Sequence, residues 1–160
     1  MTKKDKNDLP VILVCIDSSN ASVIALKYAH LKAKKLGFKI EILSVLEQSH
    51  KNLLFGSHTI SRENRKKAEI YIEKAVKKIF DKASDYPSVN IREGEVANEI
   101  IKEVRSNSNI VNLVLGKSQS SSQSDNNVLS KLADKISKKV NVPILIVPEK
   151  IDENIFKLMV

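Results

Sequence analysis

Cysteine, glycine and aromatic residues are all scarce in this sequence. It contains one cysteine, four glycines and no tryptophan, and aromatic residues make up 4% of it. A single cysteine, Cys15, excludes an internal disulfide and is typical of a reducing compartment such as the cytoplasm. Because Cys15 lies inside an apolar run, we expect a buried, inert thiol, with a redox sensor as the alternative.

Long hydrophobic runs are absent as well. No apolar run approaches the roughly 18 residues that indicate a membrane-spanning helix, and residues 1–8 lack the apolar core of a secretory signal. Hydrophobic residues still make up 42% of the 160 residues, which excludes a disordered chain and suffices for one domain with a sizeable core. We expect a cytoplasmic domain over residues 10–149, with a flexible N-terminal segment at 1–9 and a C-terminal tail at 150–160.

Positive charge is in excess, with a formal net charge of +8. Of the 27 basic residues, all but four are lysine; the exceptions are Arg62, Arg65, Arg92 and Arg105. Nucleic-acid interfaces favour arginine for bidentate contacts and aromatic side chains for base stacking. Since the lysines are spread over every predicted helix, a solvated surface accounts for the charge, and no specific nucleic-acid partner is expected.

Two kinds of apolar pattern alternate along the chain. Continuous short runs, typical of strands in a buried parallel sheet, occupy residues 11–16, 40–46, 111–115 and 144–147, and a shorter edge strand is expected at 89–92. Apolar residues at helical spacing occupy residues 21–36, 68–83, 96–104 and 129–140. Five strands alternating with four helices predict an α/β domain with one parallel sheet and helices on both faces.

Two segments lie outside this pattern. Residues 47–60 show no periodicity and are expected to form a mobile connection, in which an apolar island at 53–55 is either a solvated loop or a lid or interface. The tail at 151–160 is too apolar for a free end, so it should pack on the domain or on a partner subunit, although it can also fray.

Residues that carry chemistry are few. His30, His50 and His58 do not have metal-ligand spacing, and no cysteine is near them, so no metal site is expected. The serine-rich stretch at 118–124 lacks a Gly-x-Ser-x-Gly elbow and is expected to be a polar loop, with a phosphorylation site as the alternative. Without a nucleophile, base and orienting group in one constellation, we expect no enzymatic activity.

Four short motifs follow one another in a fixed order. They are Val-Cys-Ile-Asp-Ser at 14–18, Ile-Leu-Ser-Val at 42–45, Arg-Glu-Gly-Glu-Val-Ala-Asn-Glu-Ile-Ile at 92–101, and Leu-Val-Leu-Gly at 113–116 with Val-Pro-Ile-Leu-Ile-Val-Pro at 142–148. Together they resemble the universal stress protein family over residues 10–149. The resemblance implies a doubly wound sheet with strand order 3-2-1-4-5. It also implies a homodimer that pairs through the last strand, Ile144, Leu145, Ile146 and Val147.

That strand order places a ligand crevice outside the carboxyl ends of the first and fourth strands, at Asp17 and Gly116. Many family members bind ATP there through Gly-x2-Gly-x9-Gly followed by Ser or Thr, since glycine lets backbone N–H groups approach phosphates closely. Counted from Gly116, the second and third glycines fall on Gln119 and Leu129 and the hydroxyl on Ser130. The chain therefore resembles the branch that lacks the full glycine fingerprint, with Leu129 in space that the phosphates would occupy.

Two functional hypotheses follow from the resemblance. The first is a non-catalytic, cytoplasmic stress-response protein that acts as a homodimer, holds no cofactor and has a degenerate nucleotide site. The alternative is a switch that binds ATP or AMP through Asp17, Val45, Gly116, Ser118 and Ser130. In that alternative Asp17 bonds the ribose and Val45 contacts the adenine, although Asp17 is equally placed to cap the first helix.

Overall fold

The structure is a computed structural model that describes residues 9–47, 57–119 and 123–160. Nearly all of the predicted N-terminal segment at 1–9 and the apolar island at 53–55 lie outside the described residues. The strands are β1 (Val11–Cys15), β2 (Lys39–Leu46), β3 (Ser88–Glu93), β4 (Ile110–Lys117) and β5 (Ile144–Pro148). The helices are α1 (Asn20–Leu36), α2 (Ser57–Ile79), α3 (Val96–Ser106), α4 (Gln123–Ser137) and α5 (Glu153–Met159), with a short 3₁₀ turn at Ala83–Asp85.

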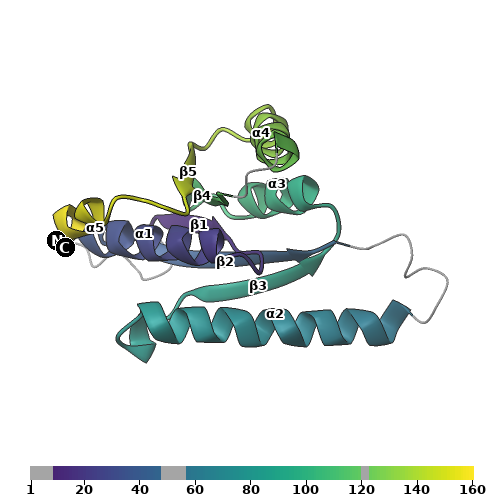
Figure 1. Cartoon of the computed structure of the whole chain (residues 1–160), viewed down its shortest axis with the longest axis horizontal. Coiled ribbons are helices and arrows are strands. Elements are labelled where there is room, and N and C mark those ends of the chain that lie inside the picture. The colour runs from purple at the N-terminus through teal and green to yellow at the C-terminus, as the bar shows by residue number, and fades with distance from the viewer. Residues whose placement is uncertain (1–8, 48–56, 120–122) are drawn as a thin grey trace.

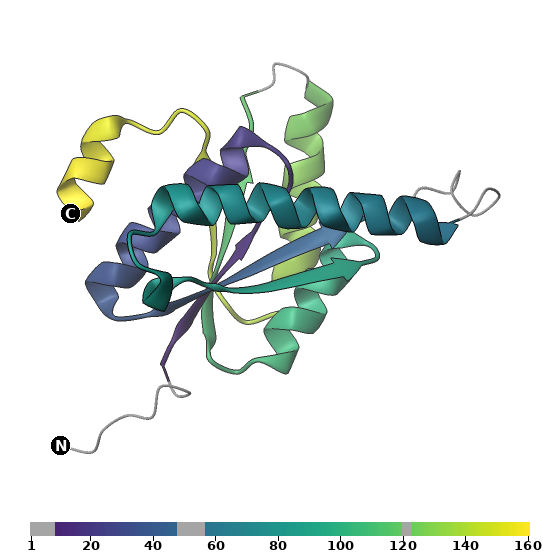
Figure 2. The same ribbon diagram turned by 90° about the horizontal axis from the view of Figure 1, so that it is seen from below.

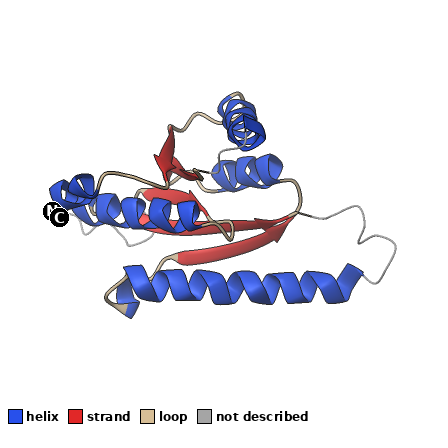
Figure 3. Ribbon diagram, in the orientation of Figure 1, coloured by secondary structure: helices blue, strands red, loops and turns tan. Residues whose placement is uncertain are grey.

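The five strands form one parallel sheet in the order β3-β2-β1-β4-β5, as predicted. Figure 1 shows α2 on one side of the sheet and α3 and α4 on the other, and Figure 3 separates the helices from the strands by colour. In the view of Figure 2, α2 crosses the sheet on the near side. The chain runs outward from β1 in both directions, which leaves a topological switch point between β1 and β4.

Alternate strand residues supply two separate cores. Ile12, Val14 and Ile42 pack with α1 and α2 on one face of the sheet. Leu13, Leu43 and Leu113 pack with α3 and α4 on the other. Since successive strand side chains point to opposite faces, a continuous apolar run is what a sheet covered on both sides requires.

Helix α2 is longer than its apolar stripe predicts. Among the residues of α2 from 62 onward, Ala68 is the first that is buried, but the helix itself begins at Ser57. The expectation of a mobile connection is therefore wrong for residues 57–60, which form the first turn of α2. Residues 62–67 are all exposed, so no apolar periodicity marks this part of the helix in the sequence.

The C-terminal tail folds as α5 and packs on α1. Nζ of Lys27 lies 4.5 Å from the ring centroid of Phe156, a cation–π contact, and Nζ of Lys35 donates to the carbonyl oxygen of Leu158 at 3.4 Å. Asp152 caps this short helix by accepting from the N–H of Asn154 at 2.9 Å. Of the arrangements that the apolar tail left open, the structure shows packing on the domain itself.

Candidate functional site

A pocket of about 940 Å³ opens at the carboxyl ends of β1, β2 and β4. Its position is the switch point between β1 and β4, where doubly wound sheets bind ligands. Residues at the ends of these strands line its floor, and α2, α3 and α4 supply the walls. Its lining combines apolar side chains with serine and charged side chains, and a concave site of mixed character at such a position is suited to a small molecule.

Four of the five predicted contact residues line this pocket. Asp17 follows β1, Val45 lies near the end of β2, and Gly116 and Ser118 lie at the end of β4 and just beyond it. The fold brings them together because parallel strands present their carboxyl ends at one edge of the sheet. The fifth residue, Ser130, is exposed on α4 and is not among the lining residues.

The start of α4 explains the position of Ser130. The apolar spacing over 129–140 predicts that Leu129 begins a helix, after a phosphate loop. Instead α4 begins at Gln123, so Leu129 lies in its second turn and Ser130 is turned outward. Leu129 and its neighbour Leu132 are half-buried, line the pocket and pack against the core under α3 and α4.

Asp17 organises the turn between β1 and α1. Its Oδ1 accepts from the backbone N–H of Ser19 at 3.0 Å and from the Ser19 hydroxyl, and its carbonyl oxygen accepts from the Ser22 hydroxyl at 2.8 Å. The N-cap of α1 is Ser19, whose Oγ accepts from the N–H of Ser22 at 3.3 Å. Of the two roles considered for Asp17, capping thus belongs to Ser19, and Asp17 holds the capping residue while its own side chain stays exposed at the pocket.

Lysines from two helices add positive charge to the pocket. Lys67 of α2 and Lys131 and Lys135 of α4 line it, together with the acidic residues Glu47 and Glu95. Sequence reasoning missed these lysines, because lysine occurs throughout the helices and nothing local distinguishes the three that face the pocket.

One of these lysines forms an ion pair at the pocket. Nζ of Lys135 lies 2.9 Å from Oε2 of Glu95, which lowers the pKa of the Glu95 carboxyl. Glu95 is also the N-cap of α3, accepting from the N–H groups of Ala97 at 3.2 Å and Asn98 at 3.1 Å. The pair therefore connects α4 to the beginning of α3.

Glu149, which directly follows β5, contacts the loop after β4 at the rim of the pocket through its carboxylate. Oε2 of Glu149 accepts from the backbone N–H of Gln119 at 3.1 Å and from the Ser118 hydroxyl at 3.4 Å. Its Oε1 accepts from Nδ2 of Asn20, the first residue of α1, at 3.1 Å. These bonds, led by that of the Gln119 N–H, hold the pKa of Glu149 below its usual range. No sequence pattern signals a contact between residues 30 positions apart.

A profile of the universal stress protein family matches residues 10–148. The chain belongs to this family. Among solved structures, it is similar to the universal stress protein UspA from Lactobacillus plantarum, with 16% identity, a TM-score of 0.69, and coverage of 87% of this chain and 97% of that one. No curated protein sequence matches the chain.

Two further similar structures are of universal stress proteins that contain nucleotides. One, from Arabidopsis thaliana with AMP bound, is 18% identical, with a TM-score of 0.61 and coverage of 90% of this chain and 94% of that one. The other, in complex with cAMP, is 16% identical, with a TM-score of 0.54 and coverage of 89% and 99%. At these identities the likeness concerns the fold.

Cys15 of this universal stress protein lies on the pocket floor. It is partly buried, and burial raises the pKa of its thiol, with smaller contributions from the nearby charges of Asp17 and Glu103. A raised pKa keeps the thiol protonated and unreactive at neutral pH. The expected full burial of Cys15 is not found, and its inertness stays a prediction.

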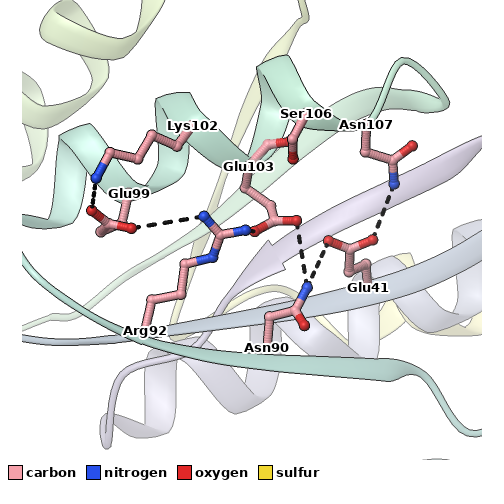
Figure 4. A network of polar contacts seen from close by, with 8 residues as sticks. All are labelled: Glu41, Asn90, Arg92, Glu99, Lys102, Glu103, Ser106 and Asn107. Atoms are coloured by element: carbon pink, nitrogen blue, oxygen red, sulfur yellow. Dashed lines mark hydrogen bonds and ion pairs between the residues drawn. The ribbon is translucent and has the colours of Figure 1, made fainter.

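A second group of charged residues lies between α3 and the β2–β3 side of the sheet (Figure 4). Glu41, Glu99 and Glu103 are all more than 90% buried there. Arg92 forms ion pairs with Glu103 and, at 3.8 Å, with Glu99. Nδ2 of Asn90 donates both to Glu41 at 3.3 Å and to Glu103 at 3.4 Å. Buried carboxylates are tolerated when they are paired and hydrogen-bonded, and this network supplies both.

The described residues show neither a metal-ligand cluster nor a membrane-spanning helix. Residues 9–47, 57–119 and 123–160 contain no group of three or more His, Cys, Asp or Glu side chains that could hold a metal ion. Nor does any helix in the same ranges have the length and apolar character needed to cross a membrane.

Proposed function

We propose that this universal stress protein is a non-catalytic, cytoplasmic stress-response protein that acts as a homodimer, and that its pocket does not accept a nucleoside triphosphate. The observation that carries the proposal is the early start of α4 at Gln123. A glycine loop would present successive backbone N–H groups to a phosphate chain. Where such a loop would end, this chain has the second turn of a helix, whose backbone N–H groups are used within the helix.

Leu129 supports the same conclusion. Its half-buried side chain forms part of the pocket wall and contacts the core under α3 and α4. A triphosphate is strongly charged and hydrated, and placing it against an apolar side chain costs free energy unless polar groups replace its water. We therefore regard the nucleotide site as degenerate at its phosphate end.

The dimer part of the proposal rests on β5. This strand pairs with β4 on one side and forms an edge of the described sheet on the other. Ile146 is 41% exposed on it, and Ile144 and Leu145 are partly exposed, whereas Val147 is buried in the core. An edge strand with unpaired backbone groups and apolar side chains is suited to pairing with a second copy.

A thermal-shift titration tests the pocket. We expect millimolar ATP with magnesium to leave the melting temperature unchanged. A ligand present at about 100 times its Kd adds about 2.7 kcal/mol, which corresponds to several degrees in a domain of this size. A shift of that size with ATP would refute the degenerate-site proposal.

Light scattering tests the dimer. We expect a dimer for the native protein and a monomer for Ile146→Lys, since a charge on an edge strand opposes pairing.

A second candidate function is recognition of a nucleoside monophosphate. It is favoured by the pocket volume, by Lys67 and Lys131 on its walls, and by the AMP and cAMP complexes of similar structures. One phosphate needs fewer donors than three and is less affected by Leu129. In the same titration, a shift with AMP but not with ATP would favour this candidate over an unliganded dimer.

A further inference from the structure

The Glu149 carboxylate is bound by three donors that come from two separate parts of the chain, the loop after β4 and the beginning of α1. They are the backbone N–H of Gln119, the hydroxyl of Ser118 and Nδ2 of Asn20, at 3.1, 3.4 and 3.1 Å. The backbone of Glu149 is fixed as well, because its N–H donates to the carbonyl oxygen of Lys117 at 2.9 Å. The β4–β5 pairing therefore fixes the backbone from which this carboxylate extends.

The donors that hold this carboxylate are of the kind that hold phosphate oxygens. Backbone N–H groups, hydroxyls and side-chain amides all bind oxyanions, and their bonds to charged groups are stronger than bonds between neutral groups. Asn20 also begins α1, and the start of a helix carries partial positive charge that favours any anion placed there. The lowered pKa of Glu149 agrees with a carboxylate that is stabilised in its charged form.

This arrangement lies at the rim of the pocket. Ser118, which bonds Glu149, is one of the lining residues, as are Gly116 before it and Ser22 in the first turn of α1. A ligand that lies in the pocket with a phosphate directed toward the loop after β4 would meet these donors. The phosphate would also be repelled by the Glu149 carboxylate, which is already bound to these donors.

We propose that the Glu149 carboxylate is an intramolecular competitor for phosphate groups at this rim, occupying the donors that a phosphate-bearing ligand of the pocket would use. The proposal concerns the same pocket as the proposed function and deepens it by naming a residue that opposes phosphate binding. It applies to the phosphate of a nucleotide and to free phosphate alike. Removing the carboxylate takes away the acceptor that the Gln119 N–H and Nδ2 of Asn20 now use, and it lowers the local negative charge.

The test compares ligand affinities of the native protein, Glu149→Ala and Glu149→Gln by isothermal titration calorimetry. The probes are AMP, ATP, inorganic phosphate and adenosine, which has no phosphate. Because the carboxylate both occupies these donors and repels a phosphate, Glu149→Ala should bind AMP or ATP roughly tenfold more tightly or better. Glu149→Gln, which keeps an acceptor but no charge, should fall between Glu149→Ala and the native protein, and adenosine should not respond to either substitution.

Glu153→Ala and Glu153→Gln are the matched controls. Glu153 is exposed at the beginning of α5, four residues away, and its substitution changes the net charge by the same amount. We expect the controls to bind every probe as the native protein does. If Glu149→Ala gains affinity for inorganic phosphate as well as for AMP, the rim alone is the anion site. If it gains affinity for AMP or ATP only, the pocket must hold the nucleoside too. Both outcomes support competition by Glu149.

Equal phosphate affinity in Glu149→Ala, Glu153→Ala and the native protein, including no measurable binding in any of them, would overturn the proposal. The proposed function fails on a different result, namely ATP binding by the native protein. Even then, the ratio between Glu149→Ala and native affinities would still decide whether Glu149 competes. Circular dichroism and melting temperatures of all variants establish that the comparison is made between folded proteins.

Discussion

Gly116 lies directly against the backbone of Ala21. A Cβ on Gly116 would come within 2.5 Å of the Ala21 carbonyl oxygen and 2.8 Å of the N atom of Ser22. The end of β4 and the first turn of α1 therefore meet with no space for a side chain. The glycine that first indicated a phosphate loop thus has a packing reason that requires no ligand.

Replacing Gly116 with alanine should destabilise the domain by about 2 kcal/mol or more, since forcing atoms into a filled contact typically costs about 1–3 kcal/mol and this contact is with rigid backbone. Urea unfolding measures the loss. Gly37→Ala is the comparison: a Cβ there meets nothing within 4 Å, and only its left-handed φ of 69° opposes alanine, at roughly 1–2 kcal/mol. If Gly116→Ala proved no more costly than Gly37→Ala, close packing would not be the reason for this glycine.

Glu95 should matter more than Lys135 for stability. Glu95→Ala removes the N-cap of α3 and should cost about 1 kcal/mol, whereas Lys135→Ala removes one half-exposed ion pair, worth about 0.2–1 kcal/mol. Chemical denaturation of both variants and of the double variant separates the two contributions. A loss in Lys135→Ala as large as that in Glu95→Ala would mean that the ion pair, and not the cap, holds the beginning of α3.

Glu103 should make the free energy of unfolding depend on pH. Burial and the neighbouring Glu41 raise its pKa, against the opposing effect of Arg92. Above the ordinary carboxyl pKa the folded protein then holds a proton that the unfolded chain has lost. Stability is therefore full below that ordinary value and falls as pH rises through the raised one.

Glu103→Gln, which cannot lose this proton, should show a smaller fall. Urea midpoints at pH 5 and pH 8 measure it: relative to the native protein, Glu103→Gln should be more stable at pH 8 than at pH 5. Glu63→Gln, on the exposed face of α2, should leave the difference between the two pH values unchanged. An identical pH dependence in the native protein and Glu103→Gln would contradict the prediction.

Cys15 should react slowly in the folded protein. Burial raises the pKa of its thiol, so little thiolate is present at pH 8. Alkylation by iodoacetamide should be much slower in buffer than in denaturant, where the thiol regains its ordinary pKa. Mass spectrometry after timed quenching measures both rates. Fast alkylation of the folded protein would instead support the redox-sensor alternative.

Much of the fold was predictable because the relevant forces act locally along the chain. The run from Val11 to Ile16 is apolar at every position, which predicts a strand covered on both faces, and the buried stripe of α2 from Ala68 has the helical period. Alternation of the two patterns predicts the parallel sheet. The resemblance to the family added the strand order, which the structure shows.

The first turn of α2 and the start of α4 were not predictable in this way. Residues 62–67 belong to the same continuous helix as the buried segment that begins at Ala68. Because they are exposed and polar, they show no apolar pattern that would predict a helix. The register counted from Gly116 assumed a loop up to Leu129, whereas the chain begins α4 at Gln123. Ser130 consequently lies on the exposed side of α4 and not among the residues that line the pocket, and its contact with a nucleotide stays a prediction.

The sequence by itself determined the class of the domain and its strands, because strand runs are local features. The resemblance to the family added the grouping of Asp17, Val45, Gly116 and Ser118 at one edge of the sheet. Only the tertiary structure decided what surrounds that edge. The contact of Glu149 with Gln119, and the sharing of Asn90 by Glu41 and Glu103, join residues that are far apart in the chain. Such contacts depend on how strands and helices pack, and polar side chains, unlike apolar stripes, carry no period that reveals their partners.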